Sequence, residues 1–381
     1  MLEFVTNRKV LIGENTVVQI PSQLKWYGKR KPLLVVYNAN ADIVKKLEQK
    51  LEEEGFSFSV YDRVIKEPDL NIIDNGAAYC LQQDCDCVIA IGGGSVIDTS
   101  KMIAMLATNG GHTEQYQLEG KAVTKAPLLF IAVPTTAGTG AEATKVSVVF
   151  NQNKGYKKSC YDNSMIAEIA VLDPETTIGL PAKITASTGM DAITHAIEAY
   201  TSLNANVVSR MYSIKALDLL TKNIVSAYNE PLNLEARTNM LLGSYFAGIA
   251  ISVGTCLAHI VGQPFGAIYG IPHGDACSIF LIPSMRVNKD YCLDRYLELA
   301  KSVGIDTNNK NDNDIFEEFI AFIENIANQI NAPKRISQYT DPAKIDVDYA
   351  VENIATSMAH IKNNPRPVSR ELFRQLILEV M

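Results

Sequence analysis

Three of the five histidines stand in segments whose residue types suit a bound metal ion. Asp191 and His195 are four residues apart, so on a helix their side chains share one face and could chelate one ion. His259 lies in an apolar stretch predicted to be a helix, and His273 lies between a proline and a glycine, at a predicted rigid turn. Three imidazoles and one carboxylate suit Fe²⁺, Zn²⁺, Mn²⁺ or Co²⁺, and affinity alone does not choose among them. We therefore predict one metal site, provided that the fold brings these four side chains together.

A histidine on its own carries less information than this set. Each of the three, taken alone, is explained more simply as a core or loop histidine, so the hypothesis rests on their combination. His112 and His360 stand in polar surroundings and are interpreted as non-ligating. Cys80, Cys85 and Cys87 cluster without a nearby histidine and lead into a buried apolar run, so they are interpreted as structural rather than as a metal site.

A glycine-rich segment, residues 92–95 (GGGS), follows the apolar run at residues 87–91. That run is typical of a strand covered on both faces, and a helix is predicted over residues 96–106. Glycine lets the backbone approach a ligand closely, and a helix start offers free N–H groups and a positive dipole end. A phosphate or pyrophosphate group would suit this place, although a plain tight turn explains a lone glycine run equally well.

A second segment of small and hydroxyl-bearing residues follows the apolar run at residues 127–133. Residues 134–144 read PTTAGTGAEAT, and such side chains can donate hydrogen bonds to phosphate, ribose or nicotinamide groups without crowding them. In an open α/β sheet, ligands lie beyond the carboxyl ends of the strands. Two such loops favour a dinucleotide site over a mononucleotide site, although neither has the usual G-x-G-x-x-G pattern.

The elements that must position these residues change character near residue 180. Before it, strands are predicted at residues 33–37, 56–61, 87–91, 127–133, 146–150 and 169–172, with helices at 41–51, 72–81 and 96–106. This alternation is typical of a mostly parallel sheet with helices on both faces. After it, long amphipathic stretches cover residues 185–200, 209–228, 234–250, 315–331, 347–361 and 370–380. We predict an α/β dinucleotide-binding domain over residues 1–180 and an all-α, metal-binding and catalytic domain over residues 181–381.

Length and composition agree with such a chain and exclude other classes. At about 150 residues per domain, 381 residues suggest two or three domains. Hydrophobic residues make up 47% and charged residues 20%, which excludes a disordered chain, a collagen and a coiled coil. The net charge of −7 gives no obvious basic face for nucleic acid or an anionic membrane, so neither partner is expected.

Two further features bear on the compartment. The N-terminal segment lacks the pattern of a signal peptide, and the 7 cysteines have no disulfide-like spacing, so a cytoplasmic protein is expected. No charged residue occurs between Arg237 and Asp275. Glycines and a proline interrupt that stretch, so it is interpreted as a buried helix and a loop rather than a membrane span.

Taken in their order along the chain, the motifs resemble those of the iron-containing (group III) alcohol dehydrogenase family. They are GGGSxxD from Gly92, PTTxGTGxE from Pro134, GxDAxxHAxEAY from Gly189, then His259, and PHG from Pro272. The resemblance covers nearly the whole chain, and the combination is far more specific than any one motif.

The resemblance implies a fold and a site. It implies an N-terminal dinucleotide-binding domain and a C-terminal helical domain, an active site in the cleft between them, and a homodimer or larger assembly. It implies that Asp191, His195, His259 and His273 are the metal ligands. It also implies a nicotinamide cofactor site that is lined by Gly93, Gly94, Ser95, Asp98, Thr135, Thr136, Thr139 and Lys158.

Two positions depart from the family pattern. Members commonly carry a further histidine four residues after the third ligand, where this chain has Gln263. Glutamine can form hydrogen bonds but cannot shuttle a proton near neutral pH, so Gln263 is predicted to orient substrate or to leave proton transfer to another group. Many NAD-preferring members place an aspartate where this chain has Asn38. NAD(H) is still favoured over NADP(H), but the electrostatic barrier against the 2′-phosphate is weaker.

The function implied is hydride transfer between NAD(P)(H) and a small primary alcohol or aldehyde. Fe²⁺ or Zn²⁺ is expected, with Mn²⁺ or Co²⁺ as alternatives, acting as a Lewis acid on the substrate oxygen. Four alternatives stay open: reduction of a phosphono-, sulfo- or hydroxy-acid aldehyde, a glycerol-dehydrogenase-like polyol enzyme, a dehydroquinate-synthase-like lyase, and a non-catalytic metal- or nucleotide-binding protein.

Overall fold

The computed structural model describes residues 3–64, 67–357 and 361–381, which form two compact units. The first unit comprises Met1–Thr136 and Gly140–Ile178, and the second comprises Ala137–Thr139 and Gly179–Met381. Residues Ala137–Thr139, which lie inside the first predicted domain, thus group with the second unit. His360, interpreted as non-ligating, lies outside the described residues.

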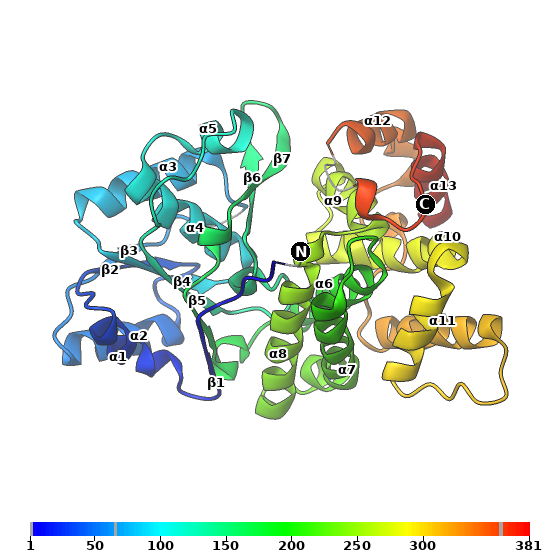
Figure 1. Cartoon of the computed structure of the whole chain (residues 1–381), viewed down its shortest axis with the longest axis horizontal. Coiled ribbons are helices and arrows are strands. Elements are labelled where there is room, and N and C mark those ends of the chain that lie inside the picture. The colour runs from blue at the N-terminus through cyan, green and yellow to red at the C-terminus, as the bar shows by residue number, and fades with distance from the viewer. Residues whose placement is uncertain (1–2, 65–66, 358–360) are drawn as a thin grey trace. The chain divides into compact units, whose positions relative to one another are not determined.

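The first unit is built on a six-stranded sheet in the order β1-β8-β5-β4-β2-β3, and every pairing in it is parallel (Figure 1). Its strands are β1 (Lys9–Ile12), β2 (Pro32–Val36), β3 (Ser59–Tyr61), β4 (Cys87–Gly92), β5 (Leu129–Pro134) and β8 (Ile169–Leu172). The chain passes from β2 to the edge strand β3, but from β4 to β5 in the opposite direction. A ligand crevice is expected outside the carboxyl ends of strands at such a reversal.

Helices cover both faces of this sheet, as Figure 1 shows for α1 and α2 on one side and α3 and α4 on the other. They are α1 (Ile20–Trp26), α2 (Asp42–Glu53), α3 (Leu70–Gln82) and α4 (Gly94–Asn109), while the short α5 (Thr113–Leu118) packs against α3. Alternate residues of β4 enter separate cores: Ile89 packs in the core that includes α2, and Val88 in the core that includes α4. All six residues of β4 are therefore buried, as its apolar sequence predicts.

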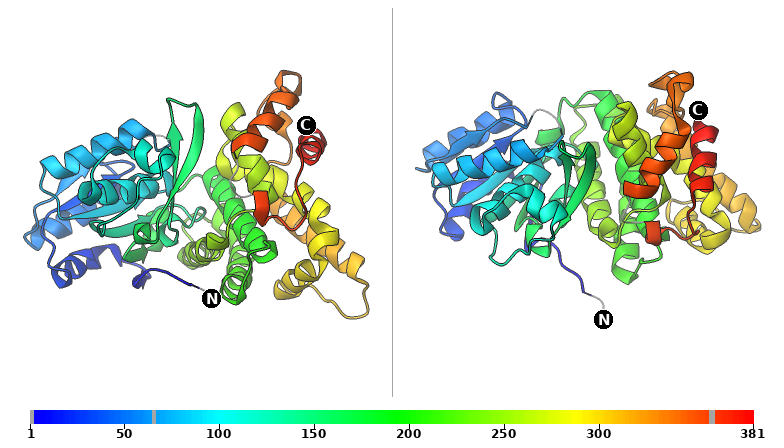
Figure 2. Two further views of the ribbon diagram at one scale, coloured as in Figure 1. Left: turned by 45° about the horizontal axis from the view of Figure 1, so that its top comes forward. Right: turned by 90° about the horizontal axis from the view of Figure 1, so that it is seen from above.

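One predicted strand does not join the parallel sheet. β6 (Val146–Asn151) pairs in antiparallel fashion with β7 (Tyr156–Tyr161), and together they form a separate hairpin, green in Figure 2. The sequence of β7 (YKKSCY) is too polar to be recognised as a buried strand. Because an antiparallel pair needs only a short connection, the tight turn between the two strands selects the hairpin over the sheet.

The second unit consists of helices packed on helices, with α6, α7 and α8 side by side (Figures 1 and 2). They are α6 (Ala182–Thr201), α7 (Val207–Asn229), α8 (Leu234–Ala250), α9 (Leu257–Tyr269), α10 (His273–Ser302), α11 (Asp312–Gln329), α12 (Val347–Ser357) and α13 (Arg370–Val380). From Thr185 onward α6 is buried on almost every side, as expected of a central core helix. The predicted fold class, an α/β part followed by an all-α part, is confirmed.

Two expectations for the helical part need correction. His273 was expected at a rigid turn, but it is the first residue of α10, with Pro272 as the N-cap. Pro272 has φ −53° and ψ 142°, an extended conformation that proline readily adopts, and its missing N–H is not needed before the helix begins, so the same Pro-His-Gly sequence serves a helix start. The predicted helix at residues 347–361 is described as α12 over Val347–Ser357, whereas Ile361, its predicted last residue, belongs to a 3₁₀ turn, Ile361–Asn363. The residues between the two lie outside the described part of the chain.

The uncharged stretch between α8 and α10 gives no straight apolar span. Among the described residues, no single helix is long and apolar enough to cross a membrane. The segments Leu234–Val253 and Leu257–Tyr269 reach that threshold only as a pair, and they are bent by 102° relative to each other.

Candidate functional site

Helix α6 carries two of the predicted metal ligands on one face. Asp191 and His195 are both buried, and the distance from Asp191 Oδ1 to His195 Nε2 is 3.9 Å. Close packing fixes this helix, because a Cβ atom on Gly189 would lie 2.6 Å from Ile224 of α7. The i, i+4 spacing therefore places both side chains on one face of α6.

His259 reaches the same point from α9. Its Nε2 is 3.4 Å from Asp191 Oδ1, and its ring stacks on that of His195 with 4.6 Å between the centroids. Gly262, one turn further along, allows α9 to approach α10 closely, because a Cβ atom there would lie 3.1 Å from the backbone of Ala276.

His273 completes the predicted set from the start of α10. Its Nε2 is 3.4 Å from Asp191 Oδ1, and its side chain is the most exposed of the four, at 35%. The glycine of the Pro-His-Gly motif is required here, since a Cβ atom on Gly274 would lie 2.1 Å from the carbonyl oxygen of Ser187 in α6. Only glycine allows α10 to begin so close to α6, and this contact brings His273 to Asp191.

These residues suit a divalent ion. Asp191 Oδ1 and His259 Nε2 are buried and form no hydrogen bond, although buried polar atoms almost always do. Ligands at about 2.0–2.1 Å from a tetrahedral ion lie about 3.3–3.4 Å from one another, and Asp191 Oδ1 lies 3.4 Å from two of the imidazoles. A cation at this point would supply the partner that both orphaned atoms lack.

Glu198 orients His259 from behind. Its Oε2 is 2.7 Å from His259 Nδ1, and its carboxylate also accepts hydrogen bonds from the backbone N–H groups of Cys256 and Ala258, at 2.9 and 2.6 Å. A carboxylate on one ring nitrogen fixes the tautomer and directs the lone pair of the other nitrogen outward, as in many histidine metal ligands. Glu198 also satisfies free N–H groups at the N-terminus of α9.

The protonation states follow from this environment. Burial alone would raise the pKa of Asp191, but His195, His273 and His259 outweigh it and hold the pKa below its ordinary value. Burial lowers the pKa of His195. A charged carboxylate and a neutral imidazole are the forms that bind metals. Burial also opposes protonation of His259, but Cys277 and Glu198 outweigh it and raise its pKa; a bound cation would replace that proton.

The two glycine- and threonine-rich loops lie side by side at the carboxyl ends of the neighbouring strands β4 and β5 of the first unit. Gly93 is the N-cap of α4, so Gly94 and Ser95 begin the helix and their N–H groups have no intrahelical acceptor. A Cβ atom on Gly93 would lie 3.3 Å from Thr136 Oγ1, which shows how closely the loops approach. Thr135 N donates to the carbonyl of Gly92 at 3.0 Å. Backbone donors and a hydroxyl thus lie together where a diphosphate could bind.

The chain resembles known proteins over nearly its whole length. Residues 7–174 match the family model described as iron-containing alcohol dehydrogenase, and residues 185–381 match the C-terminal model of the same family. Alcohol dehydrogenase 4 of Saccharomyces cerevisiae is 30% identical over 357 residues, which covers 92% of this chain and 91% of the yeast protein. The chain belongs to the iron-containing alcohol dehydrogenase family.

Other members of the family show the range of its substrates. Lactaldehyde reductase of Escherichia coli is 32% identical over 305 residues, 79% of each chain. A solved 1,3-propanediol oxidoreductase superposes with a TM-score of 0.95 at 28% identity over 100% of both chains. Sulfoacetaldehyde reductase from Bifidobacterium kashiwanohense, in complex with NAD⁺, superposes with a TM-score of 0.89 at 27% identity, over 100% of this chain and 99% of that one. The chain is an oxidoreductase acting on small alcohols and aldehydes, in a family that uses a divalent metal and a nicotinamide dinucleotide.

Within the alcohol dehydrogenase fold, several predicted cofactor residues have contacts of their own. Asp98 on α4 accepts a hydrogen bond from Val148 N at 2.9 Å and pairs with the buried Lys101 at 3.3 Å. It thus ties α4 to β6. Lys158 is exposed on β7, and Asn38, exposed after β2, accepts a hydrogen bond from Asn40 N at 2.9 Å. Thr139 lies in the short segment that groups with the second unit.

Gln263, the departure from the alcohol dehydrogenase pattern, lies half-buried on α9. It is four residues after His259, so both side chains lie on the same face of that helix. Pro264 follows it and removes one N–H group from the helix ladder.

Sequence reasoning missed Glu198 and Cys277. Glu198 is the glutamate of the GxDAxxHAxEAY motif and lies three residues after His195, on the adjacent face of α6. Cys277 belongs to a group with Asp191, His259 and His273 in which all ligand atoms lie within 4.8 Å of one another. Its spacing of four residues from His273 repeats that of Asp191 and His195, and this was the available signal.

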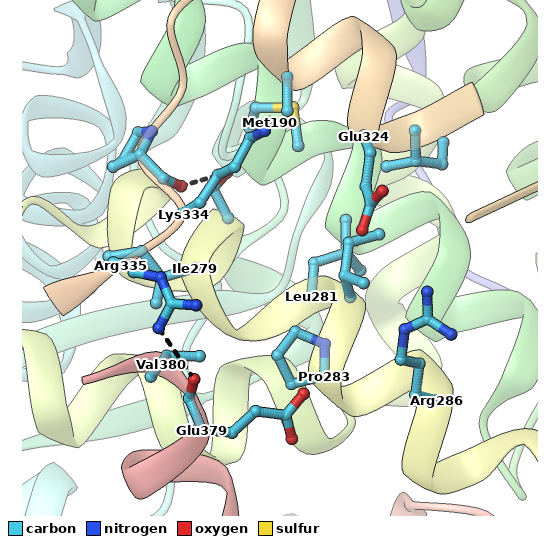
Figure 3. A pocket seen from close by; sticks show the side chains of 15 residues that line it. Met190, Ile279, Leu281, Pro283, Arg286, Glu324, Lys334, Arg335, Glu379 and Val380 are labelled. Carbon is cyan, nitrogen blue, oxygen red and sulfur yellow. Dashed lines mark hydrogen bonds between the residues drawn. The ribbon is translucent and has the colours of Figure 1, made fainter. Parts of the chain in front are cut away.

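A pocket of about 260 Å³ lies on the other side of the same helices (Figure 3). Met190 and Ser278, which precede Asp191 and follow Cys277 in sequence, contribute to its wall. Successive helical residues point about 100° apart, so the pocket and the predicted metal ligands use different faces of α6 and α10. Arg335 in this pocket donates to the carbonyl of Glu379 at 3.4 Å.

Proposed function

We propose that this chain interconverts a small aldehyde and its primary alcohol with NAD(H), at one divalent metal held by Asp191, His195, His259 and His273. The observation that carries the proposal is the convergence of two imidazole nitrogens on a buried Asp191 oxygen, each at 3.4 Å, with no hydrogen bond to that oxygen. A purely structural cluster would be expected to satisfy its buried polar atoms.

The residues divide the work between them. When bound, the metal supplies Lewis acidity toward the substrate oxygen and the nicotinamide supplies the hydride. Asp191 provides the negative charge of the ligand set, and Glu198 keeps the His259 lone pair directed at the site. Burial of Asp191 and His259 to 2% exposure excludes water from most of the site, while the partly exposed His273 marks its open side. Substrate is expected to enter there.

The first unit supplies the cofactor site in this proposal. Gly93, Gly94 and Ser95 offer backbone N–H groups to the diphosphate, and Thr135 and Thr136 offer hydroxyls. Asp98 acts indirectly, by holding α4 and β6 together. Lys158 and Thr139 remain proposed cofactor contacts on the strength of the family motif.

Gln263 favours a second candidate within the same chemistry, namely an aldehyde with a polar group beside the carbonyl. A glutamine amide can donate to and accept from such a group but cannot transfer a proton near neutral pH. The names of two relatives, a lactaldehyde reductase and a sulfoacetaldehyde reductase, support this class. Changing Gln263 to histidine and comparing butanal, lactaldehyde and sulfoacetaldehyde tests it, since a shift in relative kcat/KM is expected.

The finer assignments are also proposals. Fe²⁺ or Zn²⁺ is proposed as the native ion because an N/O ligand set accepts both. NAD(H) is proposed over NADP(H) from the family resemblance, and the NAD⁺ bound to the related sulfoacetaldehyde reductase supports this choice. A homodimer and a cytoplasmic location are proposed from the family resemblance and the sequence pattern.

The test compares His259→Ala with His112→Gln. His112 is 76% exposed and lies outside the proposed site, so it serves as a matched control for loss of a histidine. Bound metal, measured by elemental analysis, and NADH-dependent reduction of butanal should both be lost in His259→Ala, with activity falling about a thousandfold or more. His112→Gln should retain both. Full activity in a metal-free His259→Ala protein would contradict the proposal.

A further inference from the structure

We infer that the thiolate of Cys277 is an additional ligand of this metal, so that the site offers nitrogen, oxygen and sulfur. The inference rests on the proposed function, because it concerns the same ion. Cys277 is fully buried on α10, four residues after His273, and therefore shares a face with it. The two α10 residues repeat on one helix the chelating pair that Asp191 and His195 form on α6.

The distances support sulfur ligation. Cys277 Sγ is 3.8 Å from His273 Nε2, and its distances to the ligand atoms of Asp191 and His259 are at most 4.8 Å. Zinc–sulfur and zinc–nitrogen bonds of about 2.3 and 2.0–2.1 Å in tetrahedral geometry place sulfur and nitrogen about 3.6 Å apart. The observed separation is close to that value. His195 Nε2, at 3.9 Å from Asp191 Oδ1, is not part of the group whose ligand atoms all lie within 4.8 Å of one another, whereas Cys277 Sγ is.

A second observation shows that the sulfur faces a ligand site rather than apolar core. Asp191 Oδ1 and His259 Nε2, both buried, lack hydrogen-bond partners and belong to the same group as the sulfur. By contrast Cys292, also buried on α10, directs its sulfur to the carbonyl of Asn288 at 3.5 Å and lies outside that group. The two cysteines of one helix thus have different surroundings.

Coordination has two chemical consequences. As the sulfur–metal bond forms, the thiol releases its proton to solvent, so uptake of the metal should release one more proton than in a protein that lacks the thiol. A soft thiolate favours Zn²⁺ and Co²⁺ over Mn²⁺, which prefers oxygen ligands. The substitution Cys277→Ser should therefore lower the ratio of the Zn²⁺ affinity to the Mn²⁺ affinity by about tenfold or more.

Cobalt substitution gives a readout that does not depend on activity. Metal-free protein is titrated with Co²⁺, and its near-ultraviolet and visible absorption is recorded. Wild-type protein should develop a thiolate-to-cobalt charge-transfer band that saturates at one equivalent. Cys277→Ser and Cys277→Ala should bind Co²⁺ without that band, and the matched control Cys292→Ala should keep it.

The outcomes separate this inference from the proposed function. Stoichiometric Co²⁺ without the charge-transfer band in wild-type protein would overturn sulfur ligation while leaving the proposed metal site intact, and the thiol would then be a protonated neighbour. A band that persists in Cys277→Ser and Cys277→Ala would assign it to another cysteine and would also overturn the inference. Failure of wild-type protein to bind Co²⁺ at all would contradict the proposed function itself.

Discussion

The candidate cofactor loops and the candidate metal cluster offer different kinds of chemical group to a ligand. In the first unit, Gly93 and Thr136 lie at strand ends, and the groups offered to a ligand are mainly backbone N–H groups at the start of α4. In the second unit, every candidate group is a side chain, and the groups come from α6, α9 and α10. Ligand binding by backbone groups tolerates most side-chain substitutions, whereas a single substitution removes a ligand atom from a site made of side chains.

Two buried carboxyl groups, one in each unit, show the effect of neighbours. Glu142 in the first unit and Asp191 in the second each have an oxygen without a hydrogen-bond partner among the described residues. Burial raises the pKa of Glu142 to about 7, because Lys101 only partly offsets it. Three imidazoles instead hold the pKa of Asp191 below its ordinary value. Of the two, Asp191 is therefore the one prepared to bind a cation near neutral pH.

The largest effect is expected from Asp191→Ala, because it removes the only carboxylate of the proposed ligand set. The remaining imidazoles would lose their counter-charge, and we expect kcat/KM for aldehyde reduction to fall by about a thousandfold or more, with loss of bound metal. Elemental analysis and steady-state kinetics on the same sample measure both. Metal bound at the wild-type level in Asp191→Ala would show that the cluster is not the metal site.

Glu198→Gln should have a smaller but specific effect. The amide can still occupy the place of the carboxylate, but it weakens the charge-assisted contact that orients His259 at 2.7 Å. We expect the affinity for Zn²⁺ to fall about 10- to 100-fold, measured by competition with a chelating dye. Glu317→Gln is the control, since Glu317 pairs with Arg286 at an exposed position. Equal affinity in both variants would refute the orienting role.

Gly93→Ala tests whether the two sites are independent. The φ of Gly93 is −76°, which alanine can adopt, so the change mainly adds a methyl group beside Thr136. We expect KM for NADH to rise about tenfold, with bound metal unchanged. Loss of metal together with cofactor affinity would contradict the division of labour between the units.

Glu142→Gln should change stability rather than catalysis. Its folded-state pKa of about 7 lies above the reference value of 4.5, so the neutral acid is compatible with folding and ionisation is not. The destabilisation is therefore small near pH 4, grows as pH rises from 4.5 to about 7, and levels off above that. Removing the charge should stabilise the protein by about 1–3 kcal/mol at pH 8 and by much less at pH 5, as thermal unfolding at both values would reveal. An equal gain in the free energy of unfolding at both pH values would contradict destabilisation by the ionised Glu142 carboxylate.

The smallest effect is expected at Asn38. Introducing aspartate beyond β2 should repel a 2′-phosphate, and we expect the ratio of kcat/KM for NADH over NADPH to rise by about three- to tenfold. Steady-state kinetics with both cofactors measures it. An unchanged ratio would mean that Asn38 does not face the ribose.

The same contrast explains what the sequence could predict. The cofactor loops are contiguous segments at the ends of buried strands, so their residue types and order are enough to propose them. Helical spacing alone is enough to predict that Asp191 and His195 share one face. The approach of His273 depends on Gly274 fitting against Ser187, a contact between segments far apart in sequence. No spacing rule reveals such a contact, which is why the turn expected at His273 proved to be a helix start.

Glu198 and Cys277 illustrate the remaining limit. Both act through partners on other helices: Glu198 through the start of α9, and Cys277 through the cluster that α6 and α9 complete. A polar residue inside an apolar helix indicates that its side chain needs a hydrogen-bond or metal partner, but the sequence does not identify that partner. The fold class is predictable because burial patterns recur along whole helices and strands. The pairing of β6 is not predictable in this way, because it depends on the short turn that joins β6 to β7 in a separate hairpin.

The most direct measurement is a metal titration that follows activity and occupancy together. Wild-type protein is stripped with a chelator, reloaded with increasing Zn²⁺ or Fe²⁺, and assayed for NADH oxidation with butanal and lactaldehyde. Activity should rise in proportion to bound metal and stop at one equivalent, and Asp191→Ala should neither bind the metal nor recover activity. Full activity in the stripped protein would contradict the central claim that one ion at Asp191 is required for the reaction.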